Sequence, residues 1–203
     1  NNGLTNMNYR MVICFCTIFA ISCNSHPPGD TRRVEVVIET GEGDIVFELY
    51  GDKAPVSVRA FLAIVDKNLY ENTSFYRVLN IDNQASNAFK AEILQGGIWN
   101  RRKKRPELPL ISHESTNQTG LKHLRGTVSL AREEPGTASS EFFICMSDQP
   151  GLDFGGANNP DGQGYAAFGK VTKGMDVVNK IYRKPESDQY FDPPVPIFAI
   201  HRK

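Results

Sequence analysis

The sequence predicts a mainly β domain, folded as a closed antiparallel barrel that is accompanied by two α-helices. Two observations lead to this fold class. Short runs rich in β-branched and aromatic residues recur through residues 34–201, separated by glycine, proline, asparagine and aspartate. Helical spacing of apolar residues is seen in only two segments. With 203 residues, 40% of them hydrophobic, the chain can enclose one sizeable core.

A hairpin and a helix are expected first. Residues 34–39 and 44–49 read as two strands, and the Gly-Glu-Gly sequence at residues 41–43 joins them as a turn. Pro55 suits the first position of a helix. The apolar residues that follow share one helix face: Val58, Phe61, Leu62, Val65 and Leu69. This spacing predicts a helix that packs against the core.

Most of the remaining elements are strands. They are expected at residues 74–77, 93–95, 127–131, 142–146, 166–171 and 195–201. A second helix, marked by Met175, Val178 and Ile181, is expected between the last two. Alternate side chains of a strand share a face, so Phe142 and Ile144 are expected in the core, while Glu141 and Phe143 point to the opposite side.

Six short motifs follow one another along the chain. They are Phe-Tyr-Arg at residues 75–77, Gln-Gly-Gly at 95–97, Gly-Thr-Val-Ser-Leu-Ala at 126–131, Phe-Phe-Ile at 142–144, Leu-Asp at 152–153 and Phe-Gly-Lys-Val at 168–171. In this order the chain resembles the cyclophilins, the peptidyl-prolyl cis-trans isomerases, from Val34 to about His201. The resemblance implies an eight-stranded barrel with a helix over each end. It also implies an enzyme that catalyses rotation about X-Pro peptide bonds in peptides and unfolded proteins and so assists folding. No cofactor is implied for this reaction.

The same resemblance assigns the site residues. Arg77 matches the arginine that donates a hydrogen bond to the prolyl nitrogen, Gln95 the glutamine that orients it, and Phe143 a wall of the proline pocket. The implied substrate-binding residues are Ile93, Leu130, Ala131, Arg132, Glu141, Leu152 and Tyr165. Taken singly, an arginine is more often a surface ion-pair partner and a phenylalanine more often part of a core. Their joint occurrence in ordered motifs favours the site.

Several positions depart from the family pattern. Residues 80–90 lengthen the connection between Arg77 and Gln95, and Phe89 within them is a candidate to replace a family phenylalanine at the position of Glu92. Gly151 stands where the family has an aromatic residue. The departures predict a wider, more charged site, and they leave open an alternative function, a proline-binding chaperone or scaffold module with little catalytic activity.

Three substitutions bear on the charge and polarity of that site. Arg132 replaces a small polar residue, Glu141 replaces a glutamine, and Tyr165 stands where many members have histidine. Glu141 is expected to lie beside Arg77 and to compete with the substrate for its donor hydrogens, so that Glu141→Gln would raise the rate. If Glu141 instead faces solvent or pairs with Arg132, the rate would not change.

The first residues resemble a bacterial lipoprotein signal peptide. Arg10 precedes an apolar run at residues 11–21, which is shorter than the roughly 20 residues of a membrane span. The Ala-Ile-Ser-Cys sequence at residues 20–23 ends the segment in a lipobox-like pattern at Cys23. We expect a signal peptide at 1–23, lipid on Cys23, a linker at 24–33 and an isomerase domain at 34–203. An ordinary secretory peptide or a short uncleaved anchor are the alternatives.

The charge balance, the cysteines and the histidines limit which binding partners, disulfides and metal sites the sequence predicts. Lys plus Arg and Asp plus Glu number 23 each, so no global field attracts nucleic acid, and the basic run at residues 101–105 is better explained as a solvated loop. Of the cysteines, Cys14 and Cys16 would be removed, Cys23 would carry lipid and Cys145 lies on a strand, so no disulfide is expected. The histidines lack metal-ligand spacing. The expected protein is an exported, lipid-anchored monomer at the cell envelope, without metal.

Overall fold

The computed structural model describes residues 32–99 and 107–203. The expected signal peptide, the lipid site at Cys23 and the basic run at 101–105 lie outside the described residues. The strands are β1 Val34–Thr40, β2 Gly43–Leu49, β3 Thr73–Leu79, β4 Ile93–Gly97, β5 Thr127–Leu130, β6 Phe142–Cys145, β7 Ala166–Lys173 and β8 Tyr190–Arg202. The helices are α1 Pro55–Val65, α2 Thr116–Thr119, the 3₁₀ turn Pro150–Leu152 and α3 Met175–Tyr182.

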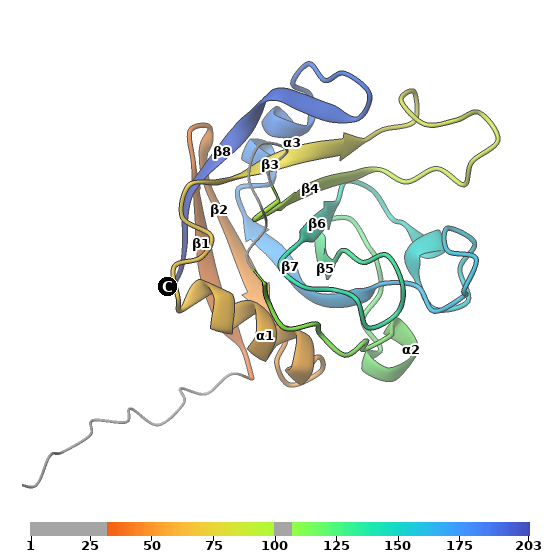
Figure 1. Ribbon diagram of the computed structural model, residues 1–203, viewed down its shortest axis with the longest axis horizontal. Helices are drawn as coiled ribbons and strands as arrows, with labels where there is room; N and C mark the ends of the chain where they lie inside the picture. Colours follow the sequence, from red (N-terminus) through yellow and green to blue (C-terminus); the bar gives the residue numbers. More distant parts are fainter. Residues whose placement is uncertain (1–31, 100–106) are drawn as a thin grey trace, which may run out of the picture.

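The eight strands close into one antiparallel barrel. Their order around it is β1-β2-β7-β5-β6-β4-β3-β8, and β8 pairs back with β1 (Figure 1). Closure gives every strand two hydrogen-bonded neighbours, so no edge is left open. The expected barrel is confirmed, although β8 begins at Tyr190 and not near residue 195. Short α2 and the 3₁₀ turn were not predicted, because three or four residues are too few to show apolar periodicity.

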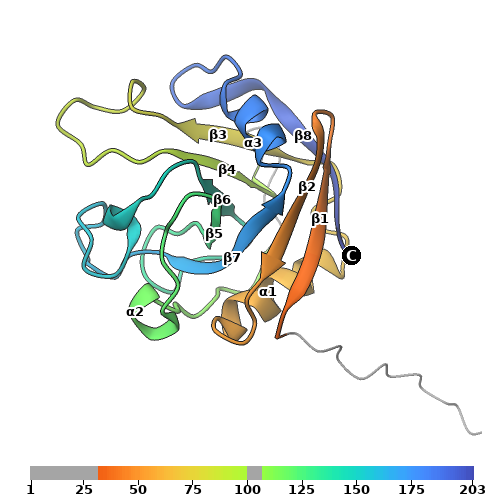
Figure 2. The same ribbon diagram turned by 180° about the vertical axis from the view of Figure 1, so that it is seen from behind.

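The two longer helices lie at opposite ends of the barrel (Figures 1 and 2). Helix α1 starts at Pro55, as predicted, and ends at Val65, so Leu69 falls beyond it. The Glu114 carboxylate accepts from the first free amides of α1, Val56 N at 3.1 Å and Ser57 N at 2.7 Å. Among the residues that the structure describes, no helix is long and apolar enough to cross a membrane.

Two apolar clusters occupy the two sides of the barrel wall. The interior cluster is centred on Phe142, whose ring meets four other rings edge-on at 5.8–5.9 Å: Phe47, Phe61, Tyr70 and Phe75. The outer cluster contains Ala91, Ile93, Phe143, Cys145 and Leu152. Alternation along β6 therefore sends Phe142 inward and Phe143 outward, as predicted.

A β-bulge interrupts the alternation of β3. The pairing of β3 with both neighbours, β4 and β8, shifts between Phe75 and Arg77. As a result, Phe75 and Val78 are both fully buried in the interior cluster. The two consecutive residues between them, Tyr76 and Arg77, both line a cavity on the outer side. A bulge thus places two neighbouring polar side chains on one face, which regular alternation would separate.

Candidate active site

A pocket opens on the outer face of the barrel, above the outer cluster. Its volume is about 220 Å³, and β3, β4, β6 and the loops around them form its walls. It brings together most of the residues that the sequence predicts: Arg77, Ile93, Gln95, Ala131, Arg132, Phe143, Leu152 and Tyr165. Residues far apart in the chain therefore meet around one apolar depression with a guanidinium at its rim.

Phe143 forms the floor of this outer pocket. Its side chain is only 1% exposed and meets the Tyr165 ring edge-on at 5.3 Å. On its other side the Phe143 ring is stacked on the His123 ring at 6.0 Å. Packing against rings on two sides gives Phe143 little freedom to move. The floor of the pocket is therefore preformed.

A buried polar group supports this floor from behind. His123 Nδ1 lies 2.8 Å from Asp153 Oδ1, and His123 Nε2 lies 3.0 Å from Ser129 Oγ. Burial, the largest single influence, would raise the pKa of Asp153, but hydrogen bonds and charge from His123 outweigh it and lower that pKa. The distances match a nucleophilic triad, yet Ser129 is 0% exposed. The group therefore positions the ring of His123 against Phe143 and has no access to a substrate.

Arg77 is held at the rim by three residues. Nη2 donates to Gln189 Oε1 at 2.6 Å and Nη1 to Gln95 Oε1 at 3.4 Å. The Tyr190 ring centre lies 5.9 Å from the Arg77 guanidinium carbon. Within the described part of the chain, Arg77 Nε is buried without a hydrogen-bond partner. An arginine is a permanent cation in proteins, so this site carries a fixed positive charge.

Glu141 is not a partner of Arg77. The Glu141 carboxylate accepts from the Tyr76 hydroxyl at 2.7 Å, the Ser140 hydroxyl at 2.9 Å and the Trp99 amide at 3.1 Å. It is 6% exposed and lines a neighbouring cavity of about 560 Å³, outside the outer pocket. The expectation that Glu141 competes for Arg77 is therefore wrong. The reason is the β3 bulge, which turns Tyr76 to the outer face and makes it the partner of the carboxylate.

A relay of hydrogen bonds connects Glu141 with Gln95 instead. Gln95 Nε2 donates to the Tyr76 hydroxyl at 2.7 Å, and that hydroxyl donates to Glu141. The Gln95 amide is thereby fixed with its oxygen toward Arg77. Gly97 makes room for this arrangement, since a side chain there would collide with the Glu141 carboxylate and its φ of 147° disfavours other residues.

The Arg132 side chain holds the neighbouring loop in place, and its charge is paired with that of Asp161. It is 1% exposed, and its two Nη atoms reach the Asp161 carboxylate at 2.6 and 3.0 Å. Arg132 also donates from Nε to the Gly164 carbonyl at 3.0 Å. The hydrogen bonds from the Arg132 Nη atoms lower the pKa of Asp161. The prediction of a more charged site is therefore wrong as far as Arg132 is concerned, because Asp161 neutralises it.

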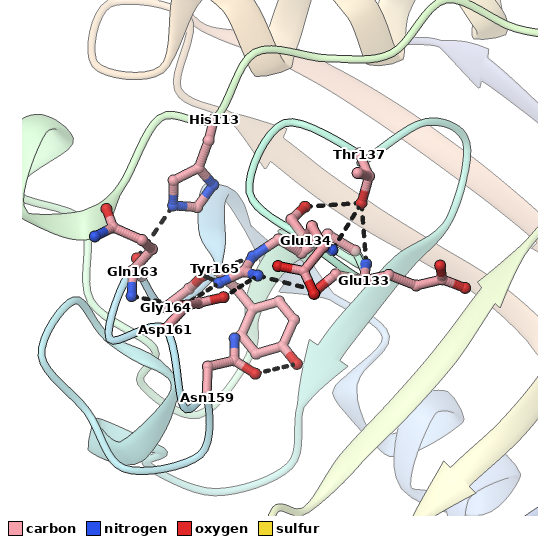
Figure 3. A network of polar contacts seen from close by, with 10 residues as sticks. His113, Glu133, Glu134, Thr137, Asn159, Asp161, Gln163, Gly164 and Tyr165 are labelled. Carbon is pink, nitrogen blue, oxygen red and sulfur yellow. Dashed lines mark hydrogen bonds and ion pairs between the residues drawn. The ribbon is translucent and has the colours of Figure 1, made fainter.

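Tyr165 is fixed by the same loop. Its ring centre lies 5.2 Å from the Arg132 guanidinium carbon, and its hydroxyl lies 3.2 Å from the side-chain amide of Asn159. Figure 3 shows Tyr165 between Asn159 and the Asp161–Gly164 segment. The tyrosine hydroxyl is thus placed at the wall where many family members have histidine.

The lengthened connection after β3 closes one side of the outer pocket. Gln84, Phe89 and Ala91 line it, and Gln84 bonds to the backbone of Ala91 in both directions, at 2.8 and 3.0 Å. Phe89 contributes to the wall as expected, although it is 69% exposed. The Phe89 carbonyl accepts from Asn158 Nδ2 at 2.9 Å. Contacts such as these are not visible in the sequence, because they join loops that are distant in the chain.

Two further positions differ from expectation. Leu130 is 1% exposed and lies in the interior cluster, so its assignment to the substrate pocket is wrong. Alternation along β5 explains this, because Val128 and Leu130 point inward together. Gly151 does not simply widen the pocket, since the side chain of Asn158 occupies the space beside its Cα. Sequence reasoning missed Leu79, Gln84, Ala91 and Asn158 as lining residues.

The sequence and the fold are both similar to those of known proteins. The family model described as cyclophilin type peptidyl-prolyl cis-trans isomerase/CLD matches residues 35–202. The chain is 35% identical to peptidyl-prolyl cis-trans isomerase A of Dickeya dadantii (strain 3937), over 86% of this chain and 85% of that one. It is 38% identical to isomerase B of Escherichia coli (strain K12), over 72% and 82%. A Cryptosporidium parvum cyclophilin type isomerase, crystallised in the presence of the dipeptide Ala-Pro, is 26% identical with a TM-score of 0.65, over 83% and 98%.

Proposed function

The chain belongs to the cyclophilin-type peptidyl-prolyl cis-trans isomerase family, and we propose that Arg77, Gln95 and Phe143 carry the isomerase reaction in the outer pocket. One observation carries this assignment. The partly exposed guanidinium of Arg77 lines an apolar pocket whose floor is Phe143. Proline fits such a pocket because its ring is apolar and it lacks an amide hydrogen.

The proposed chemistry breaks no covalent bond. A peptide bond resists rotation because the nitrogen lone pair is shared with the carbonyl, which gives a barrier of about 18–20 kcal/mol. As the bond twists, the lone pair returns to the nitrogen and can accept a hydrogen bond. The Arg77 guanidinium, which lines the pocket, supplies that donor, and the interaction grows only toward the transition state, which is the condition for catalysis. Phe143, Ile93 and Leu152 hold the ring while the preceding carbonyl turns.

The remaining assignments follow from the walls of the pocket. The backbone of Ala131 and Arg132 would pair with an extended substrate, and the Tyr165 hydroxyl would face a substrate carbonyl. The amide of Ala131 already donates to the Glu141 carbonyl at 2.9 Å, whereas its own carbonyl accepts no backbone bond among the described residues and is the group proposed for pairing. Because the outer pocket is complete within one copy of the chain, we propose a monomer as the active unit. The alternative of a binding module with little activity is not favoured.

A short peptide containing Ala-Pro tests where the reaction takes place. We expect catalytic amounts of the protein to give cis-trans exchange signals in a two-dimensional NMR spectrum of the peptide. Backbone amide shifts should change mainly at Ile93, Ala131 and Leu152, which line the pocket. The same peptide with alanine in place of proline is the control, and it should give neither exchange signals nor shift changes. Catalysed exchange with shift changes confined to another face of the barrel would contradict the assignment.

We also propose that the mature protein is exported and held at the cell envelope by lipid on Cys23. Support comes from the sequence alone: Arg10, the short apolar run at residues 11–21, and the small residues before Cys23. A single acyl chain binds a membrane only weakly, so stable anchoring needs more than one. The isomerase domain would then act on proline-containing segments of client proteins at the membrane surface.

Replacing Cys23 by serine tests the anchor. In a bacterial host we expect the wild-type chain to incorporate labelled fatty acid and to enter the detergent phase, because the thiol is the proposed acceptor of the lipid. Cys23→Ser should do neither, whereas Cys14→Ser, inside the segment to be removed, should behave as the wild type. Unlabelled wild-type protein in the soluble exported fraction would rule out the anchor and leave the isomerase assignment untouched.

A further inference from the structure

We propose that Gln189 is a positioning residue for the isomerase reaction and that it, more than Gln95, fixes the guanidinium of Arg77. This inference rests on the proposed role of Arg77. Gln189 lies in the turn before β8, far from the site in sequence and absent from the residues that line the outer pocket. Its direct contact with Arg77 is the route by which we expect it to act on the reaction.

The two glutamines hold Arg77 with different strength. The bond from Arg77 Nη2 to Gln189 Oε1 is 2.6 Å long, at the short end for a donor that carries charge. The bond from Nη1 to Gln95 Oε1 is 3.4 Å long, close to the outer limit for a hydrogen bond. Because both bonds join the same charged guanidinium to an amide oxygen, the shorter bond makes Gln189 the stronger restraint.

The turn that carries Gln189 is itself well fixed. The backbone amide of Gln189 donates to Glu186 Oε2 at 2.6 Å. Its backbone carbonyl accepts at 2.8 Å from the amide of Val78, the residue after Arg77 in β3. Asp188 and Gln189 both have left-handed backbones, with φ of 54° and 71°. Non-glycine residues keep this conformation only where their surroundings enforce it. The anchor of Arg77 is thus rigid.

The same side chain connects Arg77 with the lengthened loop. While Gln189 Oε1 accepts from Arg77, its Nε2 donates to the Asn83 carbonyl at 3.1 Å. Asn83 belongs to residues 80–90, which also supply Gln84 and Phe89 to the pocket wall. The side-chain amide of Gln189 therefore fixes the position of the Arg77 guanidinium relative to that wall. Tyr190, the next residue, lies over the guanidinium at 5.9 Å, so the turn restrains Arg77 both in its plane and on its face.

Two variants separate the contact to Arg77 from the contact to the loop. Gln189→Met has a similar length but lacks a strong acceptor and a donor. Gln189→Glu keeps an acceptor toward Arg77, loses the donor to Asn83 and adds a negative charge that strengthens the hold on the guanidinium. Asp188→Asn is the matched control, because Asp188 is exposed in the same turn and asparagine tolerates its left-handed backbone.

We expect Gln189→Met to lower kcat for an Ala-Pro peptide about tenfold with KM nearly unchanged, since a small misplacement of a catalytic group costs up to about 10²-fold. Gln189→Glu should recover most of the rate, and Asp188→Asn should match the wild type. Unchanged kcat in Gln189→Met, or a raised KM with unchanged kcat, would overturn the proposal, because it would mean that Gln189 does not act through Arg77.

The Arg77 guanidinium provides a readout that does not depend on activity. In ¹⁵N NMR, a guanidinium held at one Nη shows separate Nη signals, whereas free rotation averages them. We expect separate signals in the wild type and in Gln189→Glu, and averaged signals in Gln189→Met. Averaged signals in the wild type would overturn the proposal. Separate signals in a wild type without isomerase activity would uphold the positioning by Gln189 and refute the catalytic role of Arg77.

Discussion

Replacing Arg77 by alanine is expected to slow isomerisation about 10²–10³-fold, the effect of removing one preorganised donor from a transition state. In the structure no other cation among the described residues takes this position: Arg132, the nearest candidate in the pocket, is bound by Asp161 and the Gly164 carbonyl. Arg77→Ala therefore leaves the prolyl nitrogen without a donor. The affinity for the peptide should fall by a smaller factor than the isomerisation rate, because Phe143, Ile93 and Leu152 still form the pocket.

The measurement is the catalysed exchange rate of an X-Pro peptide, together with circular dichroism and thermal unfolding of each variant. Arg77→Lys keeps a charge but loses the planar guanidinium that Gln189 and Gln95 hold, so we expect a loss close to that of alanine. Arg59→Ala, at an exposed position on α1, is the control and should keep full activity. An unchanged rate in a folded Arg77→Ala protein would show that another group catalyses the reaction.

Replacing Glu141 by alanine is expected to lower the free energy of unfolding by about 2–5 kcal/mol. The carboxylate is 6% exposed and accepts hydrogen bonds from Tyr76, Ser140 and the Trp99 amide. Its removal leaves these donors without their acceptor in a place that water reaches poorly. Such a buried, unsatisfied donor costs about 1–3 kcal/mol.

Glu141→Gln distinguishes this account from the competition that the sequence predicts. The amide can still accept from Tyr76, but its nitrogen replaces the oxygen that serves Ser140 and Trp99. We therefore expect a milder loss of stability than in Glu141→Ala and little change in the rate, because the bond to Tyr76, which orients Gln95, is kept. Urea unfolding and the exchange rate measure the two effects. Glu133→Gln, an exposed carboxylate lining the neighbouring cavity, should change neither. A faster Glu141→Gln enzyme would restore the competition hypothesis.

The barrel was predictable because its strands obey local rules. The alternation at Phe142 and Phe143 assigns one ring to each side of the wall, and the structure confirms both. Pro55 and the apolar spacing behind it located the first helix. Leu130 shows the limit of carrying roles over from a resemblance, since the same alternation, applied to β5, turns it into the interior.

The sequence by itself determined the fold class, the family resemblance and most of the pocket residues, because these depend on periodicity and on ordered motifs. Only the tertiary structure decided which groups surround Arg77 besides Gln95. The bulge in β3 places Tyr76 and Arg77 on one face, so that the Tyr76 hydroxyl donates to the Glu141 carboxylate. Strict alternation does not predict this contact. Gln189 reaches Arg77 from 112 positions away in the chain. Such contacts arise from the closure of the barrel, which brings β8 beside β3, and no local pattern encodes them.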